Sequence, residues 1–268
     1  MRPPMRRLAE GQGGFRESGE LVCHCLLIET NEALVLVDTG LGTHALQDPR
    51  QRLGRRFMGT RPVLDPAETA AAQVRALGFD PADVRHIVLT HLDIDHSSGL
   101  ADFPDALVHV HGPELRAATS GTRLQRRRYI PWAWEHGPQW RVHEFDGGER
   151  WFGFDSVRPL SGLQADIALI PLAGHTTGHV GVAIQPGGPE QGWLLHAGDA
   201  FLHRGRLDPR ARVPAGMAFF ETLSQTNGVL RRHNQRMLRR LRHMHGSEVE
   251  VFCAHDAAQF RALAPKPA

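Results

Sequence analysis

The segment THLDIDHSSGL, residues 90 to 100, carries four side chains that can bind a metal ion within six positions. They are His91, Asp93, Asp95 and His96. Alternate residues of an extended segment point the same way, so the first three can face one ion. The adjacent pair at its end can reach a second ion. Because two neighbouring transition-metal ions need about six or seven imidazole and carboxylate donors, this segment predicts half of a two-metal site.

Three later segments repeat one pattern, an apolar run followed by a small residue and a potential ligand. AGHTTGH places His175 in this way, HAGDA places Asp199, and FCAHD places His255. A single histidine of this kind more often caps a helix or fills a core. The chain has 17 histidines, however, and the repeated pattern together with the first motif indicates metal ligands.

These motifs resemble those of a known family. HLDIDH, GHTTGH, AGD and AHD follow VDTG in the order seen in the metallo-β-lactamase fold superfamily, and the resemblance covers residues 21 to about 258. It implies an α/β fold, namely an αβ/βα four-layer sandwich of two mixed β-sheets flanked by helices, with a binuclear site at one edge. We expect residues 1–20 to be an N-terminal extension and residues 21–268 to form the metallo-β-lactamase-like domain.

The resemblance implies that seven side chains hold two divalent transition-metal ions. The first ion would be bound by His91, Asp93 and His175. The second would be bound by Asp95, His96 and His255, and Asp199 would bridge the two ions. Zinc is the first expectation, with iron or manganese as alternatives.

Other residues receive supporting roles from the same resemblance. Asp95 is the candidate catalytic residue, because it could take a proton during reaction. His179 would orient a ligand by hydrogen bonding. Asp38 of VDTG would be a buried structural carboxylate near the site and not a ligand.

Asp93 departs from the family's usual motif, His-x-His-x-Asp-His, which has histidine at this position. A carboxylate can coordinate at about 2.0 to 2.2 Å, much as imidazole does. It adds negative charge and a harder donor, which makes iron or manganese more acceptable beside zinc. The alternative is that Asp93 makes no bond to metal and leaves a weak or absent first site.

The expected function is a binuclear metal-dependent hydrolase, in which a metal-bound hydroxide attacks a small ester, lactone or amide. The layout is closest to the acyl-homoserine-lactone lactonase branch. That branch carries a tyrosine shortly after the bridging aspartate, whereas this chain has Phe201 and Leu202. Lactonase activity is therefore one member of a broader hydrolase prediction.

Three other classes stay open. The acidic Asp93 makes a di-iron redox enzyme conceivable, related to the flavodiiron or dioxygenase branches, but this chain shows no flavin or glutathione site. A phosphodiesterase or nuclease of the superfamily finds support only in the basic run RRHNQRMLRRLRH. A binding-only descendant is disfavoured because all seven donor positions are occupied.

Composition limits the partners and the compartment. A formal net charge of +2 does not indicate a nucleic-acid partner, and no run of residues approaches the 18 or so apolar positions of a membrane span. Cys23, Cys25 and Cys253 form no disulfide framework. We expect a cytoplasmic protein that acts on a small molecule, with a homodimer left open.

Local patterns place the motifs on regular elements. Strands are predicted over residues 21–30, 32–42, 84–90, 106–112, 166–174, 178–185, 192–200 and 249–256, and helices over 66–79 and 223–245. Residues 116–150 show no clear period and are interpreted as a loop or a broken helix. Within them, Tyr129, Trp132 and Trp134 could form a lid over the site, or cover a core edge or a dimer interface.

Overall fold

The computed structural model describes residues 1–163, 165–187 and 189–264, and its strands form two mixed sheets. The first sheet has the order β1-β2-β3-β4-β5, in which only β1 and β2 are antiparallel. Its strands are β1 Leu26–Glu29, β2 Leu34–Val37, β3 Val84–Val88, β4 Leu107–His111 and β5 Gln139–His143.

The second sheet has the order β11-β10-β9-β8-β7-β6, and only β10 and β11 are parallel. Its strands are β6 Glu149–Trp151, β7 Phe154–Pro159, β8 Asp166–Pro171, β9 Val180–Gln185, β10 Trp193–His196 and β11 Val249–Phe252.

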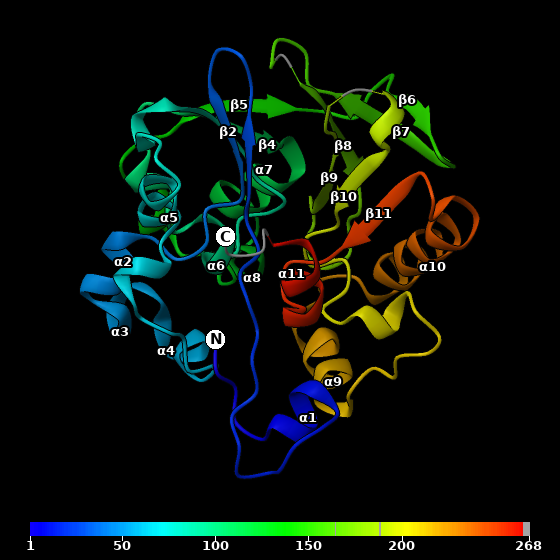
Figure 1. Cartoon of the computed structure of the whole chain (residues 1–268). Helices are drawn as coiled ribbons and strands as arrows, with labels where there is room; N and C mark the ends of the chain where they lie inside the picture. The colour runs from blue at the N-terminus through cyan, green and yellow to red at the C-terminus, as the bar shows by residue number, and fades with distance from the viewer. Residues whose placement is uncertain (164, 188, 265–268) are drawn as a thin grey trace.

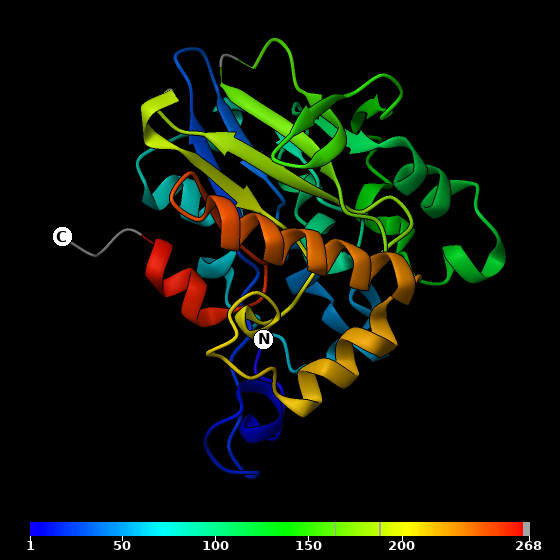
Figure 2. The same cartoon turned by 90° about the vertical axis from the view of Figure 1, so that its right-hand side faces the viewer.

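Helices cover the outer faces of both sheets (Figures 1 and 2). The α-helices are α1 Arg6–Glu10, α2 Thr43–Gln47, α3 Pro49–Arg52, α4 Gly54–Met58, α5 Ala70–Ala76, α6 Ile94–Ser97, α7 Gly112–Thr119, α8 Arg123–Arg126, α9 Ala215–Ser224, α10 Gly228–His245 and α11 Ala257–Leu263. Short 3₁₀ turns are η1 Pro66–Glu68, η2 Pro81–Asp83, η3 Leu100–Asp102, η4 Pro131–Trp134, η5 Pro189–Gln191 and η6 Arg204–Arg206. Within the described ranges, no helix is both long and apolar enough to cross a membrane.

Apolar side chains between the sheets and on their outer faces hold these elements together. Val35 and Val37 of β2 pack between the sheets against residues of β8 and β9, including Val180. Leu238 and Leu241 of α10 are buried against the outer face of the second sheet. The expected four-layer sandwich of two mixed sheets flanked by helices is confirmed.

Several predicted boundaries shift for local reasons. The strand predicted from residue 21 begins at Leu26, and the helix predicted over 66–79 is a 3₁₀ turn followed by α5, whose N-terminus is capped by the Thr69 hydroxyl. The helix predicted over 223–245 begins only at Gly228, because Asn227 caps its first backbone N–H groups.

The prediction of a loop or broken helix over 116–150 was wrong for part of that range. Residues 139–143 form β5, an edge strand that is largely solvent-exposed and paired in parallel with β4. A half-exposed strand of five residues carries no apolar period, so its pairing with β4 decides its conformation. Tyr129 is buried in the core under the first sheet, and Trp132 and Trp134 pack on the core around Ala133. These aromatic side chains therefore cover a core edge.

The buried carboxylate of Glu114, in α7, joins the two halves of the fold. Its Oε1 accepts from the Leu92 backbone N–H and the Tyr129 hydroxyl, both at 3.0 Å, and its Oε2 accepts from the Gly178 N–H at 2.9 Å. Leu92 follows β3 in the first sheet, and Gly178 precedes β9 in the second. One side chain thus fixes the distance between two of the predicted ligand loops.

We expect Glu114→Gln to lower the free energy of unfolding by about 1–3 kcal/mol, because the amide presents an N–H₂ group to one of these buried donors. Chemical denaturation measures this change. The control is Glu144→Gln, which removes an ion pair between exposed side chains, Arg116 and Glu144, and should cost about 0–1 kcal/mol. Equal losses in the two variants would contradict this role for Glu114.

Candidate metal centre

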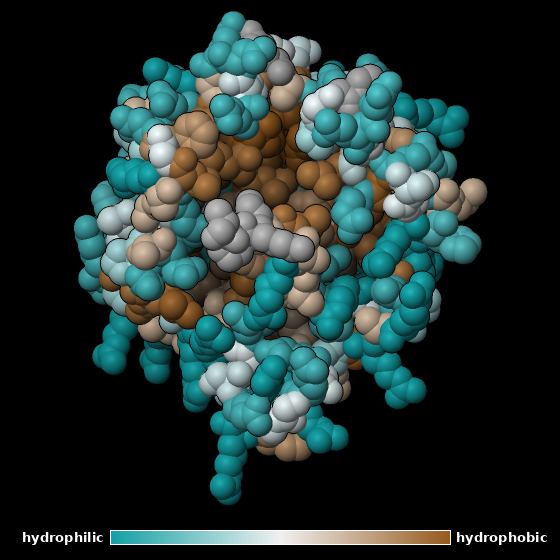
Figure 3. Space-filling view, in the orientation of Figure 1, coloured by the Kyte–Doolittle hydropathy of each residue, from teal (hydrophilic) through white to brown (hydrophobic). Residues whose placement is uncertain are grey.

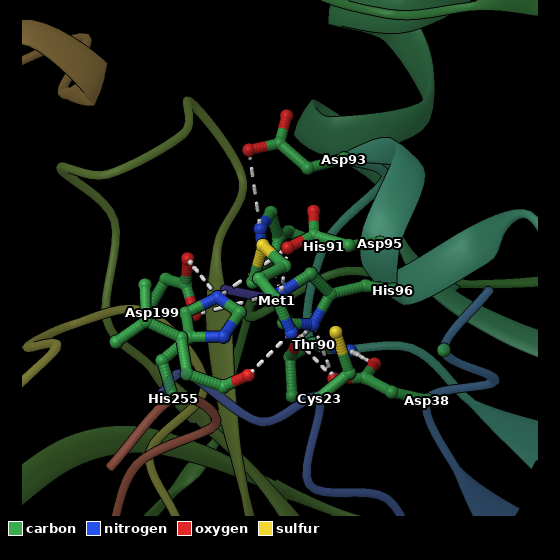
Figure 4. Close-up of polar contacts among 12 residues, drawn as sticks. Met1, Cys23, Asp38, Thr90, His91, Asp93, Asp95, His96, Asp199 and His255 are labelled. Atoms are coloured by element: carbon green, nitrogen blue, oxygen red, sulfur yellow. Dashed lines mark hydrogen bonds and ion pairs between the residues drawn. The ribbon is translucent and has the colours of Figure 1, made fainter. Parts of the chain in front are cut away.

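The predicted ligands follow the carboxyl ends of four strands. His91 lies three residues beyond β3, His175 four beyond β8, Asp199 three beyond β10, and His255 three beyond β11. Asp95 and His96 lie on α6, a single helical turn that begins directly after Asp93. The fold brings these loops together, and Figure 4 shows His91, Asp95, His96, Asp199 and His255 close to one another.

Two groups of donor atoms share Asp199. In the first group, donor atoms of His91, His175 and Asp199 lie within 4.8 Å of one another. In the second group, the same holds for His96, Asp199 and His255. The Nε2 atoms of His175 and His255 lie 3.3 and 3.2 Å from Asp199 Oδ2, and His96 Nε2 lies 3.5 Å from Asp199 Oδ1. Asp199 thus stands between the groups, where a bridging ligand would be needed.

Asp95 joins the second group from α6. Its Oδ2 lies 3.5 Å from His255 Nε2 and 4.0 Å from His96 Nε2. The carboxylate is almost fully buried, at 9% exposure, so it faces the site and not solvent.

Hydrogen bonds on the far sides of the rings orient the Nε2 atoms toward the site. His96 Nδ1 donates to Asp38 at 2.7 Å, and His255 Nδ1 donates to the Val22 carbonyl at 2.6 Å. His91 Nδ1 lies 3.0 Å from the Thr90 hydroxyl, which itself donates to Asp38. A histidine ligand of a metal ion is usually oriented in this way.

Buried atoms without a hydrogen bond fit a bound cation. Among the described residues, His91 Nε2, His96 Nε2 and Asp199 Oδ1 are buried and have no hydrogen-bond partner. Buried polar atoms are nearly always satisfied, so three such atoms in one cluster suit metal coordination. The imidazole and carboxylate donors are also those that zinc and other transition metals prefer.

The charge of the cluster points the same way. Burial lowers the pKa of His96, but the carboxylates of Asp199, Asp38 and Asp95 outweigh that effect and raise this pKa to about 10. Burial opposes ionisation of Asp199, yet His255, His96 and His175 hold the pKa of Asp199 well below its usual range. The carboxylates of the site therefore favour positive charge beside them, which a bound cation could supply in place of the imidazole protons.

Asp38 and His179 hydrogen-bond to residues of the donor groups, and their supporting roles beside a metal ion stay predictions. Asp38 accepts from the Thr90 backbone N–H at 2.8 Å as well as from the Thr90 hydroxyl and His96. Its backbone has φ 56°, a left-handed conformation that aspartate tolerates better than most residues. The Asp199 N–H donates to His179 Nε2 at 2.8 Å, so His179 holds the loop that carries Asp199.

Asp93 has a partner that the sequence did not reveal. Arg128, just before Tyr129, donates through Nε to Asp93 Oδ1 at 2.6 Å and through Nη2 to Asp93 Oδ2. Burial raises the pKa of Asp93, but the Arg128 guanidinium outweighs that effect and holds it well below its usual range. Asp93 Oδ2 remains 3.4 Å from His91 Nε2 and 3.1 Å from His175 Nε2. Asp93 therefore borders the first group, and its role as a ligand stays a prediction.

Arg128 also hydrogen-bonds to a nitrogen atom that is expected to bind metal. Its Nη2 donates to His175 Nε2 at 2.7 Å, and its Nη1 donates to the Ser224 carbonyl. An ion in the first group could bind His175 only if Arg128 gave up this bond. The donors of the second group are free of such competition, so the fit is better there.

A family model described as the metallo-beta-lactamase superfamily matches residues 18–236. The chain belongs to the metallo-beta-lactamase superfamily. It is 46% identical over 237 residues to a probable metallo-hydrolase of Mycobacterium tuberculosis. This match covers 88% of this chain and 75% of that protein. The chain is 30% identical over 182 residues to an N-acyl homoserine lactonase of Azorhizobium caulinodans, which covers 65% of this chain and 63% of that protein. The prediction of a metallo-hydrolase of this superfamily is confirmed at this level.

Solved structures of this superfamily share the fold. A product complex of an N-acyl homoserine lactone hydrolase superposes with a TM-score of 0.70 at 18% identity, over 99% of this chain and 93% of that one. The dizinc quorum-quenching lactonase AidC superposes with a TM-score of 0.59 at 16% identity, over 96% of this chain and 84% of that one. At these identities the likeness concerns the fold alone.

We expect Asp38→Asn to weaken metal binding about 10- to 100-fold, because it removes the carboxylate that orients His96. Competition with a chromophoric chelator measures the affinity. The control is Asp80→Asn, which changes an exposed carboxylate that caps η2. Unchanged affinity in Asp38→Asn, with native circular dichroism, would contradict the positioning role.

Asp93 can be tested against its partner. If Asp93 binds the first ion, Asp93→Ala should weaken zinc binding there by at least about tenfold. The double variant Asp93→His, Arg128→Met restores the usual motif and removes the guanidinium, and should retain or increase zinc occupancy. Arg128→Met alone is the control. If Asp93→Ala keeps the wild-type zinc stoichiometry and affinity, Asp93 pairs with Arg128 and does not bind the metal ion.

Proposed function

We propose that this protein is a binuclear metal-dependent hydrolase of a small ester, lactone or amide. The observation that carries the proposal is the pair of buried donor groups that share Asp199 and contain atoms without a hydrogen bond. His91 and His175, with Asp93 at the border, would hold the first ion. Asp95, His96 and His255 would hold the second.

Two bound ions would lower the pKa of a shared water and polarise the substrate carbonyl. The protein supplies the geometry for this chemistry. Asp95 presents a buried carboxylate beside the second group, in a position to take a proton during reaction. Asp199 and His179 keep the two donor groups at a fixed separation.

A cavity beside the site supports a small-molecule substrate with an apolar part. It has a volume of about 660 Å³, within the usual range for ligand pockets, and extends from Cys23 and Thr39. Its walls are mainly apolar and include Leu21, Leu26, Leu36, Val74, Leu194 and Phe252. Figure 3 shows the apolar hollow on this face of the molecule.

The relatives named as N-acyl homoserine lactonases favour a lactone within this substrate class. The chain differs from that branch at the position of the expected tyrosine. Phe201 and Leu202 are buried, and the chain's single tyrosine, Tyr129, donates its hydroxyl to Glu114. The chain therefore has no phenol after Asp199 as that branch does, and the substrate panel compares lactones directly with activated esters.

The decisive experiment combines metal analysis with a substrate panel. We expect the purified protein to bind close to two transition-metal ions and to hydrolyse members of a panel of lactones, esters, thioesters, phosphodiesters and β-lactams under nitrogen. His91→Ala and His255→Ala should each lose metal and activity together. His233→Ala changes an exposed histidine of α10 and serves as the control.

Full activity after exhaustive chelation would contradict the proposed mechanism. Bound iron with oxygen consumption would favour a redox enzyme. Phosphodiester hydrolysis with salt-sensitive polyanion binding would favour a nuclease.

A further inference from the structure

A thiol lies beside the second donor group. Cys23 Sγ, a carboxylate oxygen of Asp95 and a ring nitrogen of His255 all lie within 4.8 Å of one another. Figure 4 shows Cys23 next to the ligands that converge from α6 and from the loops after β10 and β11. Cys23 comes from the opposite end of the chain, in the segment before β1.

Backbone contacts fix this segment against the ligand loops. The Val22 carbonyl accepts from His255 Nδ1 at 2.6 Å, and the His24 N–H donates to the Ala254 carbonyl at 2.9 Å. The His24 carbonyl accepts from His196 Nε2 at 2.6 Å. Cys23 lies between these anchored residues, so its place beside His255 follows from the backbone and not from one side-chain rotamer.

Two buried atoms of the second donor group have no hydrogen-bond partner among the residues that the structure describes, which is an observation independent of Cys23. His96 Nε2 and Asp199 Oδ1 are buried and make no hydrogen bond to the described residues. The Cys23 thiol likewise makes no side-chain hydrogen bond within the described part of the chain. His255 belongs both to the group that contains Cys23 and Asp95 and to the group that contains His96 and Asp199, so the thiol lies next to the second donor group.

We propose that the Cys23 thiolate is a further ligand of the second metal ion. The proposal rests on the proposed function of the site, and it adds a donor that the five sequence motifs do not contain. On binding, the thiol loses its proton to solvent and sulfur donates an electron pair to the ion. The softer sulfur donor makes zinc or cobalt preferable to manganese in the second position.

Cys25 provides a matched control. It lies two residues away, is half-buried like Cys23, and directs its Sγ to the Cys23 carbonyl at 3.7 Å. Within the described ranges, Cys25 belongs to none of the groups able to hold a metal. Its side chain packs on the core of the first sheet.

The test is a titration of the chelator-treated full-length protein with Co²⁺, followed by absorption spectroscopy. Wild type and Cys25→Ser should show the near-ultraviolet charge-transfer band of a thiolate bound to cobalt. Cys23→Ser should lack the band and should bind zinc at the second position at least about tenfold more weakly. Cys23→Asp should keep two ions per chain without the band.

The outcomes separate the two proposals. Wild type that binds two cobalt ions without the band overturns ligation by Cys23 and leaves the binuclear site intact. The same band in Cys23→Ser also overturns it. Wild type that binds no cobalt overturns the metal site and this ligand together. Absence of the band from the wild type decides against Cys23 even if Cys23→Ser does not fold, and in that case Cys23→Asp takes its place in assigning a band that is present.

Discussion

The site depends on the fixed placement of one sheet against the other. His91, Asp95 and His96 follow a strand of the first sheet, whereas His175, Asp199 and His255 follow strands of the second. Neither sheet alone can assemble a donor group. The Val180 N–H donates to the Thr90 carbonyl at 2.9 Å, and Glu114 bonds to loops on both sides. These contacts hold the two halves at the spacing that metal coordination requires.

The four aspartates of the site differ in the side chains that balance their charges. Asp38, Asp93, Asp95 and Asp199 lie close together in a largely buried region, where isolated charges are costly. Asp38 is balanced by His96, and Asp93 is balanced by Arg128. Asp95 and Asp199 instead face the imidazoles of the donor groups. A bound cation would take over from these imidazoles the balancing of the two carboxylates.

Sequence patterns predicted most of the fold and the convergence of the ligand loops. This was possible because each loop of predicted ligands follows an apolar strand, and strands of like direction end at the same edge of a sheet. Boundaries at residues 21–30 and 66–79 were less accurate, since hydrogen-bonded caps and anchors decide them. The edge strand β5 was not predicted, because its pairing with β4 and not an apolar period of its own determines its conformation.

Local sequence patterns did not predict the contacts between distant segments. Arg128 is the last of three consecutive arginines, and nothing in that run distinguishes it from its neighbours. Glu114 looks like an ordinary acidic residue in the first turn of a helix. Cys23 stands outside every ligand motif. Each acquires its role only through a partner 15 or more positions away, and such contacts depend on the complete tertiary structure.

The bond between Arg128 and His175 has a consequence for metal loading. A guanidinium and a metal ion would compete for His175 Nε2. The apparent metal affinity of the first position would therefore be the intrinsic affinity reduced by the free energy of breaking the bond to Arg128. Arg128 also bonds to the Ser224 carbonyl at the end of α9. The same guanidinium thus contacts both a predicted ligand and α9, so a shift of Arg128 on filling the first position would link occupancy of a buried ion thermodynamically to the packing of a surface helix.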